Sequence, residues 1–231
     1  MKILISDKMS DKVEDVLKSK SIEYDIKTGM APEELKSVID QYDGILIRSA
    51  TKLTAEILED CKNLKVVGRA GVGVDNVDLD TATKNKILVM NTPLGNLEAT
   101  AELTIGLMFS LYRHIHLANQ STHDGKWEKS KFMGTELKGK TLGIVGFGNI
   151  GQRVAEMASV IGMKIITNSN SASDEDLSKL GASKVSTEKL LTDSDVLSLH
   201  TKLNDSTKNM LNNSSIGTMK PSAVIINCAR G

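Results

Sequence analysis

One glycine-rich segment limits the possible folds of this chain more than any other feature. Residues 141–145 read as a short buried strand, and Gly146-Phe-Gly148-Asn-Ile-Gly151 follows at once and opens a helix with apolar periodicity. The Gly-x-Gly-x-x-Gly pattern is weak alone, but between a strand and a helix it is typical of a dinucleotide-binding turn. The other interpretation is an ordinary glycine-rich turn, and this context favours dinucleotide binding.

The three glycines and the start of the helix have separate roles in such a turn. Gly146 would allow the tight turn, Gly148 the close approach of a pyrophosphate, and Gly151 the close packing of helix on strand. The first N–H groups of a helix lack partners within the helix and carry a partial positive charge. We therefore expect the phosphates to lie at this helix N-terminus, beside Asn149 and Ile150.

The position that selects the adenosine ribose departs from the usual pattern. An acidic residue commonly follows the next strand, about 20 positions after the motif, and holds the ribose. This chain has Thr167-Asn-Ser169-Asn there, so Ser169 stands at the acidic position and no arginine lies beside it. An acidic group would repel the 2′-phosphate of NADP, whereas Ser and Asn can accept one. We expect NAD as the cofactor and keep NADP as an open alternative.

The rest of the chain alternates short apolar runs with amphipathic segments, which predicts an α/β protein with two parallel sheets. The expected strands are residues 2–5, 22–26, 44–47, 64–67 and 87–90, then 141–145, 164–167, 196–199 and 223–226. Residues 93–96 interrupt this alternation, and we expect one long apolar helix over residues 98–118, with Leu103, Leu107 and Leu111 four residues apart. This places two domains at residues 1–97 and 98–231.

Charge and composition exclude several classes of function. Lys plus Arg equals Asp plus Glu, at 29 each, which argues against nucleic acid or an anionic membrane as the main partner. No apolar run approaches the ~20 residues of a membrane helix, and the N-terminal run is too short for a signal peptide. Cys61 and Cys228 lie too far apart in sequence to indicate a disulfide framework or a metal site. We expect a cytoplasmic protein without a bound metal.

Further segments resemble those of the D-isomer-specific 2-hydroxyacid dehydrogenases, and the resemblance covers essentially the whole chain. They are Leu-Ile-Arg48-Ser49-Ala-Thr-Lys-Leu-Thr, Val-Gly-Arg69-Ala-Gly-Val-Gly-Val-Asp-Asn-Val-Asp, Asn91-Thr-Pro-Leu-Gly-Asn, Ala101-Glu-Leu-Thr and Asp124-Gly-Lys-Trp-Glu-Lys129-Ser-Lys-Phe-Met-Gly. Asn-Cys228-Ala229-Arg230-Gly matches the catalytic-arginine motif of this family. The resemblance implies a flavodoxin-like substrate domain, a Rossmann-type domain inserted after it, and hydride transfer between a nicotinamide cofactor and a small 2-hydroxy acid.

The resemblance also assigns roles to residues. Arg230 would be catalytic, because a planar guanidinium can grip a carboxylate through two hydrogen bonds and polarise the carbonyl. The substrate would be held by a loop with its backbone N–H groups and by phosphate-binding side chains. These residues are Arg69, Ala70, Gly71, Val72 and Gly73 in the loop, then Arg48 and Ser49, with Lys129 as a further candidate. Val72, His200, Thr201, Cys228, Ala229 and Arg230 would line the cofactor site.

Each of these assignments has a simpler alternative. A glycine loop after a strand is often only a structural turn, and an exposed arginine at a strand end is often only the partner in a surface ion pair. Cys228 has no base beside it in sequence, so we interpret its thiol as a packing group rather than a nucleophile. At His200-Thr201 the family usually continues with proline, where this chain has Lys202.

Within the family, the segments around Arg48-Ser49 and Lys129 favour the members that oxidise D-3-phosphoglycerate to 3-phosphohydroxypyruvate on the route to serine. Two alternatives stay open. One is a glyoxylate or hydroxypyruvate reductase of the same family, whose substrates carry no phosphate. The other is a non-catalytic dinucleotide-binding or corepressor-like protein.

The catalytic His of the family, and the Glu that orients it, lie after the motif that contains Arg230. We therefore expect this chain to be a truncated part of a longer protein and to be inactive by itself, since such a dyad contributes about 10²–10⁴-fold to the rate. Members of the family are usually dimers or tetramers, so we also expect a homo-oligomer for the full-length protein.

Overall fold

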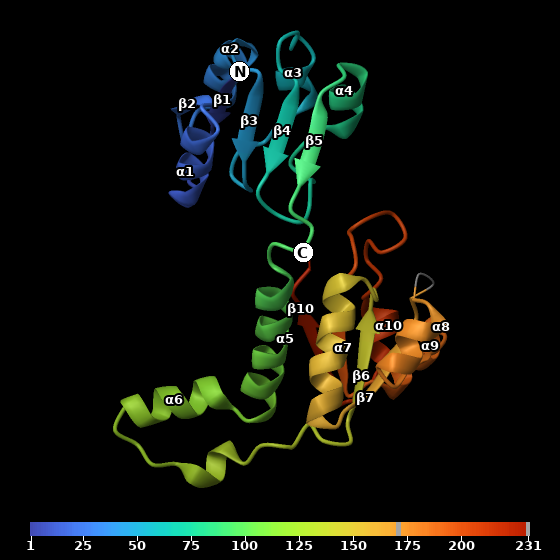
Figure 1. Cartoon of the computed structure of the whole chain (residues 1–231). Helices are drawn as coiled ribbons and strands as arrows, with labels where there is room; N and C mark the ends of the chain where they lie inside the picture. The colour runs from blue at the N-terminus through green and yellow to red at the C-terminus, as the bar shows by residue number, and fades with distance from the viewer. Residues whose placement is uncertain (170–171, 230–231) are drawn as a thin grey trace. The chain divides into compact units, whose positions relative to one another are not determined.

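The structure, a computed structural model, describes residues 1–169 and 172–229 of the chain. The chain divides into two compact units, Met1–Asn96 and Leu97–Gly231. Each unit is built on its own five-stranded parallel sheet, as Figure 1 shows. The predicted fold class, α/β with two parallel-sheet domains, is confirmed.

The first unit has the strand order β2-β1-β3-β4-β5. Its strands are β1 (Lys2–Ile5), β2 (Glu23–Ile26), β3 (Gly44–Ile47), β4 (Val66–Arg69) and β5 (Leu88–Asn91). Its helices are α1 (Lys12–Ser19), α2 (Pro32–Val38), the 3₁₀ turn η1 (Ile39–Gln41), α3 (Ala55–Leu58) and α4 (Leu79–Lys84). This order is flavodoxin-like, and the strand order reverses between β1 and β3, where ligands bind in open sheets of this kind.

The three central strands of this unit, β1, β3 and β4, are mostly buried, which explains their apolar sequences, whereas the edge strands β2 and β5 bury no residue fully. On β1, Leu4 packs into one hydrophobic cluster, and its neighbours Ile3 and Ile5 pack into another. Successive side chains of a strand point to opposite faces, so each cluster covers one face of the sheet. The carboxyl ends of the strands are thereby held together at one edge.

The second unit has the order β10-β9-β6-β7-β8, and its strand order reverses between β6 and β9. Its strands are β6 (Thr141–Val145), β7 (Lys164–Thr167), β8 (Ala182–Lys184), β9 (Val196–Leu199) and β10 (Val224–Asn227). Its helices are α5 (Leu97–Tyr112), α6 (Ile115–His123), η2 (Lys129–Phe132), α7 (Asn149–Ile161), α8 (Asp174–Lys179), α9 (Thr187–Asp193) and α10 (Asn213–Gly217). This is the Rossmann type of order, and α5 and α7 pack side by side against the sheet (Figure 1).

The strand predictions differ from the structure in small ways. Five strands begin and end where the sequence predicted, and four others are displaced by one or two residues. Sequence analysis missed β8, a three-residue edge strand with the sequence Ala-Ser-Lys. This strand lacks an apolar run because it lies at an edge, where two of its three residues are exposed.

The prediction of one long helix over residues 98–118 was wrong. The structure has two helices there, because α5 ends at Tyr112 and α6 starts at Ile115. His114 has a left-handed backbone with φ 52°, which no α-helix continues through. The carbonyl of Tyr112 accepts the N–H of Thr135 at 2.8 Å, so the returning chain satisfies the end of α5.

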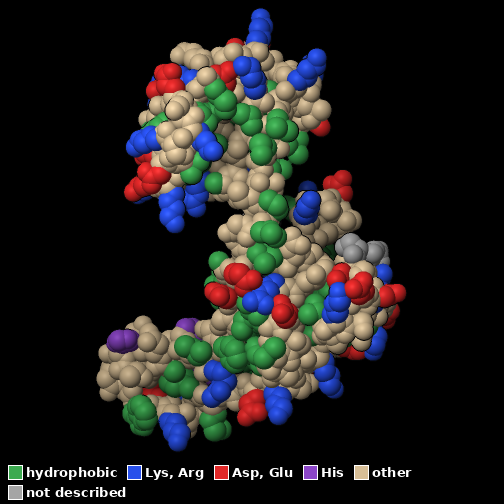
Figure 2. Space-filling view, in the orientation of Figure 1, with side chains coloured by type: hydrophobic (Ala, Val, Ile, Leu, Met, Phe, Trp, Pro, Cys, Tyr) green, Lys and Arg blue, Asp and Glu red, His purple; other side chains and the backbone are tan. Residues whose placement is uncertain are grey.

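The apolar residues noted within this helix do not form its buried face. The residues that α5 buries are Ala101, Thr104 and Met108. Leu103, Leu107 and Leu111 are instead 57%, 37% and 40% exposed. Figure 2 shows hydrophobic side chains on the surface over α5 and α6. None of the helices in the described part of the chain is both long and apolar enough to cross a membrane.

Candidate functional site

The glycine loop of the second unit has the geometry of a phosphate-binding turn. Gly146 has φ +88°, and a Cβ atom there would lie 2.6 Å from the carbonyl oxygen of His200. A Cβ on Gly151 would lie 2.2 Å from the carbonyl oxygen of Gly146, so only glycine lets α7 approach β6 this closely. A Cβ on Gly148 would meet no atom within 4 Å. Gly148 therefore leaves open space in front of the backbone, where a phosphate can approach.

Helix α7 starts at this open space without a capping side chain. Gly148 is its N-cap residue, and the first turn contains no acidic side chain. Asn149 is exposed, whereas the side chain of Ile150 packs against the core, so that only the backbone of Ile150 could contact a ligand at this turn. Uncapped N–H groups at the N-terminus of a thirteen-residue helix are a suitable site for a pyrophosphate.

The chain after β9 forms the other side of this loop. The N–H of His200 donates to the carbonyl of Val145 at 2.8 Å, which continues the pairing of β9 with β6. The His200 ring is hydrogen-bonded to Ser198 Oγ at 2.8 Å. Burial lowers the pKa of His200 to about 4, so the imidazole is neutral at physiological pH. A neutral imidazole at this position is not expected to act as a general acid.

A pocket of about 410 Å³ opens at the carboxyl ends of β9 and β10. Thr201 and Ala229, both predicted to contact the cofactor, line it together with Leu199, Lys202, Met210 and Asn227. Cys228 packs instead against the hydrophobic core of the unit, as predicted for its thiol. Arg230, the predicted catalytic residue, lies outside the described residues.

The segment predicted to contact the adenosine ribose follows β7. The Asn168 amide donates to Thr187 Oγ1 at 3.1 Å, and the N–H of Ser169 donates to Thr167 Oγ1 at 3.2 Å. Thr167 pairs in register with Lys184, the last residue of β8. Sequence analysis found no arginine near Ser169 and missed this lysine, because β8 itself was missed. Lys184 forms no ion pair with any residue in the described ranges.

In the first unit, Arg48 and Ser49 follow β3 at the switch point of the sheet, and both are exposed. The N–H of Arg48 donates to the carboxylate of Asp7 at 2.5 Å, and its guanidinium donates to the carbonyl of Lys8 at 3.3 Å. The guanidinium forms no ion pair with the described residues. It remains available to an anion from solution.

Arg69, the last residue of β4, is a buried cation, only 7% exposed. Its Nε donates to Asn76 Oδ1 at 3.1 Å, and no carboxylate within residues 1–169 and 172–229 pairs with it. The guanidinium lies against Gly71, where a Cβ would be 2.1 Å from Nη1. A buried guanidinium without a carboxylate partner favours the binding of an anionic ligand.

The loop after Arg69 supplies fewer backbone donors than the sequence suggested. The N–H of Ala70 donates to Ile47 and that of Gly71 to Arg69, at 2.9 Å each. Val72 and Gly73 are the two loop residues whose N–H groups form no hydrogen bond within the described part of the chain. The carbonyls of Gly71 and Val72 accept bonds from Thr92 and Asn91, which fixes the loop against the start of the next segment.

Sequence analysis gave no role to two side chains that hold these arginines in place. Asp7 is buried and accepts bonds from the Arg48 and Thr51 backbones and, at 2.8 Å, from the Thr51 hydroxyl. Asn76 contacts Arg48, Thr51 and Arg69. One signal pointed to Asp7, since polar residues just after buried strands at a switch point often serve a ligand site. Lys129, in contrast, is exposed in η2 of the second unit.

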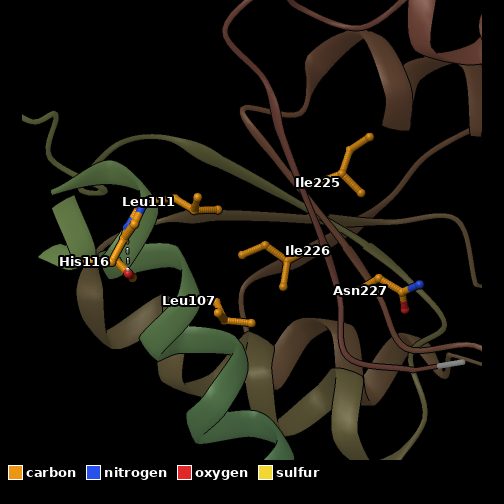
Figure 3. Close-up of a pocket in the computed structure, with 7 residues that line it drawn as sticks. Leu107, Leu111, His116, Ile225, Ile226 and Asn227 are labelled. Carbon is orange, nitrogen blue, oxygen red and sulfur yellow. Dashed lines mark hydrogen bonds between the residues drawn. The ribbon is translucent and has the colours of Figure 1, made fainter. Parts of the chain in front are cut away.

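A second pocket of the second unit, of about 430 Å³, lies between α5 and β10 (Figure 3). Leu107, Leu111, Ile225 and Ile226 line most of it, and Ser110 and His116 contact each other at 3.5 Å on its wall. No described Lys, Arg, Asp or Glu side chain lines this apolar pocket. Among the described residues, no group of three or more His, Cys, Asp or Glu side chains could hold a metal ion.

Comparisons with known proteins agree with this geometry. A family model described as "D-isomer specific 2-hydroxyacid dehydrogenase, NAD binding domain" matches residues 105–231. A D-3-phosphoglycerate dehydrogenase from Synechocystis sp. is 42% identical over 230 residues, which are 100% of this chain and 41% of that protein. The chain therefore spans less than half the length of this relative.

Two further matches extend the comparison. A hydroxypyruvate reductase from Thermotoga maritima is 46% identical over 199 residues, covering 86% of this chain and 64% of that protein. The crystal structure of the TT0316 protein from Thermus thermophilus superposes with a TM-score of 0.91 at 33% identity, over 100% of this chain and 74% of that one.

Proposed function

Because the chain belongs to the D-isomer-specific 2-hydroxyacid dehydrogenases, we propose that its protein oxidises D-3-phosphoglycerate to 3-phosphohydroxypyruvate with NAD, a step that leads to serine. The observation that carries the substrate is a pair of arginines, Arg48 and Arg69, held by one asparagine at the carboxyl edge of the first sheet. The identity to a D-3-phosphoglycerate dehydrogenase over the whole chain supports it.

The two cations suit the two anionic groups of this substrate. Arg69 is buried beside the loop 70–73, where the N–H groups of Val72 and Gly73, which form no hydrogen bond with a described residue, can add to the binding of a carboxylate. Arg48 is exposed and can reach a phosphate, which a guanidinium binds through two parallel hydrogen bonds. Arg230 would bind and polarise the reacting carbonyl, on the strength of its sequence motif.

The proposed cofactor would bind at the glycine turn of the second unit. The nicotinamide dinucleotide would place its pyrophosphate at Gly148 and the first turn of α7, and its nicotinamide would accept the hydride from the substrate. NAD is proposed rather than NADP, although Ser169 and the nearby Lys184 leave room for a 2′-phosphate. A side-by-side titration with NADH and NADPH decides this point, and a clear preference for NADPH would replace NAD.

The test of the reaction is an initial-rate assay on the protein as its gene encodes it. D-3-phosphoglycerate, D-glycerate, D-lactate and hydroxypyruvate are each tried in the direction they permit, with NAD(H) and NADP(H). The proposal expects the highest kcat/KM with the phosphorylated acid and a strong loss of it in Arg48→Ala. Equal turnover of unphosphorylated substrates would instead favour a hydroxypyruvate reductase, the second candidate, which the relative from Thermotoga maritima supports.

We also propose that the protein acts as a homo-oligomer in the cytoplasm. The support is the exposed apolar surface of the second unit, where Leu103 is 57% and Trp127 85% exposed. Large apolar side chains gathered on a surface are typical of protein–protein contacts. Sedimentation equilibrium measures the assembly state, and a monomer at micromolar concentration would contradict this proposal.

A further inference from the structure

Asn76 makes three side-chain hydrogen bonds that join the two arginines. Its amide nitrogen donates to the carbonyl of Arg48 and to the carbonyl of Thr51, at 2.7 Å each. Its amide oxygen accepts from Arg69 Nε at 3.1 Å. The side chain thus holds the backbone of the exposed arginine with one end and the guanidinium of the buried arginine with the other.

The chemistry of these contacts requires an amide. Two carbonyl oxygens face the nitrogen, and a cationic N–H faces the oxygen, so Asn is the one side chain of this size with donors and an acceptor in the right places. A carboxylate would repel both carbonyls and would also neutralise Arg69. The backbone carbonyl of Asn76 accepts from Leu53 at 2.8 Å, which fixes the position of the residue itself.

Asp7 holds the same segment from its N–H side. Its carboxylate accepts from the N–H groups of Arg48 and Thr51, at 2.5 and 3.2 Å. The carbonyls of these same two residues are held by Asn76. The segment 48–51 is therefore bound on both sides, although it is an exposed loop that a strand end would otherwise leave mobile.

We propose that Asn76 is a positioning residue that sets the distance between the two anion-binding arginines, and thereby selects hydroxy acids with a second anionic group at the far end. This inference rests on the proposed function, because it gives the arginines the substrate roles assigned above. Asn76 acts through Arg48 and Arg69 and needs no contact with the substrate. Asp7 supports it by holding the same loop.

The experiment compares Asn76→Ala and Asn76→Asp in the protein as its gene encodes it. Kd and KM for D-3-phosphoglycerate should rise about 10- to 100-fold, the usual effect of losing hydrogen bonds to a charged group. The Kd for NADH should stay within a factor of about two, because the glycine turn and the first turn of α7, which would hold the pyrophosphate, lie in the other unit and Asn76 contacts neither. The preference for D-3-phosphoglycerate over D-glycerate should shrink, which a loss of general stability would not produce.

Asn85→Ala is the matched control. The Asn85 amide also donates to two carbonyls of the first unit, those of Leu58 and Glu59, at 2.6 and 3.2 Å, but it contacts neither arginine. Asn85→Ala should lower the unfolding free energy, measured by urea denaturation, by about as much as Asn76→Ala does. It should leave the Kd for D-3-phosphoglycerate unchanged. If Asn76→Ala does not fold, Asp7→Asn must show the same selective loss of substrate binding.

The outcomes separate the two proposals. If Arg48→Ala and Arg69→Ala leave the Kd for D-3-phosphoglycerate unchanged, the proposed substrate site is wrong. If these variants weaken binding but the Asn76 variants do not, or if Asn85→Ala weakens it equally, the positioning role is wrong. In an Arg48→Ala, Arg69→Ala background the Asn76 change should add almost nothing, because coupled residues are not additive.

Discussion

The two units of this chain have the same kind of sheet but, under the proposed function, would bind anions by different means. In the second unit the backbone would bind a phosphate, because Gly146, Gly148 and Gly151 leave the N-terminus of α7 open. In the first unit side chains would bind the substrate, because Arg48 and Arg69 carry the charge and Asp7 and Asn76 hold them in place. The backbone site depends on the absence of a Cβ atom at its glycines, whereas the side-chain site depends on the hydrogen bonds that hold its arginines.

The largest expected effect tests the backbone site. Gly151→Ala would place a Cβ against the carbonyl of Gly146, which is backbone and cannot move aside cheaply. We expect a loss of about 1–3 kcal/mol in the unfolding free energy of the second unit and loss of NADH binding. Urea unfolding and NADH fluorescence titration measure the two effects.

Gly148→Ala is the control for this variant. Its added Cβ would meet no atom within 4 Å, and its φ of −80° suits any residue, so the protein should fold normally. The Cβ would occupy the space proposed for the pyrophosphate, so NADH binding should still weaken. If Gly148→Ala binds NADH as well as the parent protein, the phosphates do not lie at this turn.

The next effect tests the side-chain site. Arg69→Met removes a buried charge that has no carboxylate partner among the described residues. The unfolding free energy should stay within about 1 kcal/mol, because a buried charge stabilises a fold little. Binding of D-3-phosphoglycerate should weaken about 100-fold, as isothermal titration calorimetry would show. A large loss of stability with unchanged binding would mean that Arg69 is a structural residue.

Low pH should change the unfolding free energies of the two units differently, because all four histidines, at 114, 116, 123 and 200, lie in the second unit. The pKa of His200 is about 4 in the folded protein, below its usual 6.5, so the unfolded chain binds more protons between these values. The unfolding free energy of the second unit should therefore fall, by about 2 kcal/mol from pH 7 to pH 4.5. Urea denaturation measured between pH 7 and pH 4.5 should show that this fall in unfolding free energy is absent from His200→Gln. If the variant loses as much stability as the parent protein, His200 does not cause the pH dependence.

The smallest effect concerns Gly71. A Cβ there would meet the Nη1 atom of Arg69, the end of a flexible side chain, so the guanidinium can shift aside. We expect Gly71→Ala to leave stability nearly unchanged and to weaken substrate binding about 10-fold. Calorimetry on this variant and on Gly68→Ala, whose Cβ would meet Leu46 instead, separates displacement of the arginine from general crowding. Equal losses in both would contradict the special role of Gly71.

The fold was largely predictable because apolar periodicity is a local property. Buried strands such as β1, β3, β6 and β9 stand out in the sequence, and their alternation with helices identifies parallel sheets. The predictions failed where context decides. The break between α5 and α6 depends on Thr135, which bonds the end of α5 from 23 positions later in the sequence, and β8 shows no burial to recognise.

The site divides in the same way. The glycine turn was recognised from its spacing together with the strand before it and the helix after it, because all of these features lie within a short stretch of the chain. Asp7 and Asn76 were assigned no role, because they act on Arg48 from positions 41 residues before it and 28 residues after it. Such contacts exist only once the sheet has formed, so no periodicity in the sequence indicates them.

The boundary between Asn96 and Leu97 has a consequence for how this chain could evolve. The glycine turn lies wholly on one side of that peptide bond, and the paired arginines with their asparagine lie wholly on the other. Under the proposed function, recombination at this point would exchange the paired arginines while keeping the glycine turn. A change of substrate and a change of dinucleotide could then begin on different sides of one peptide bond.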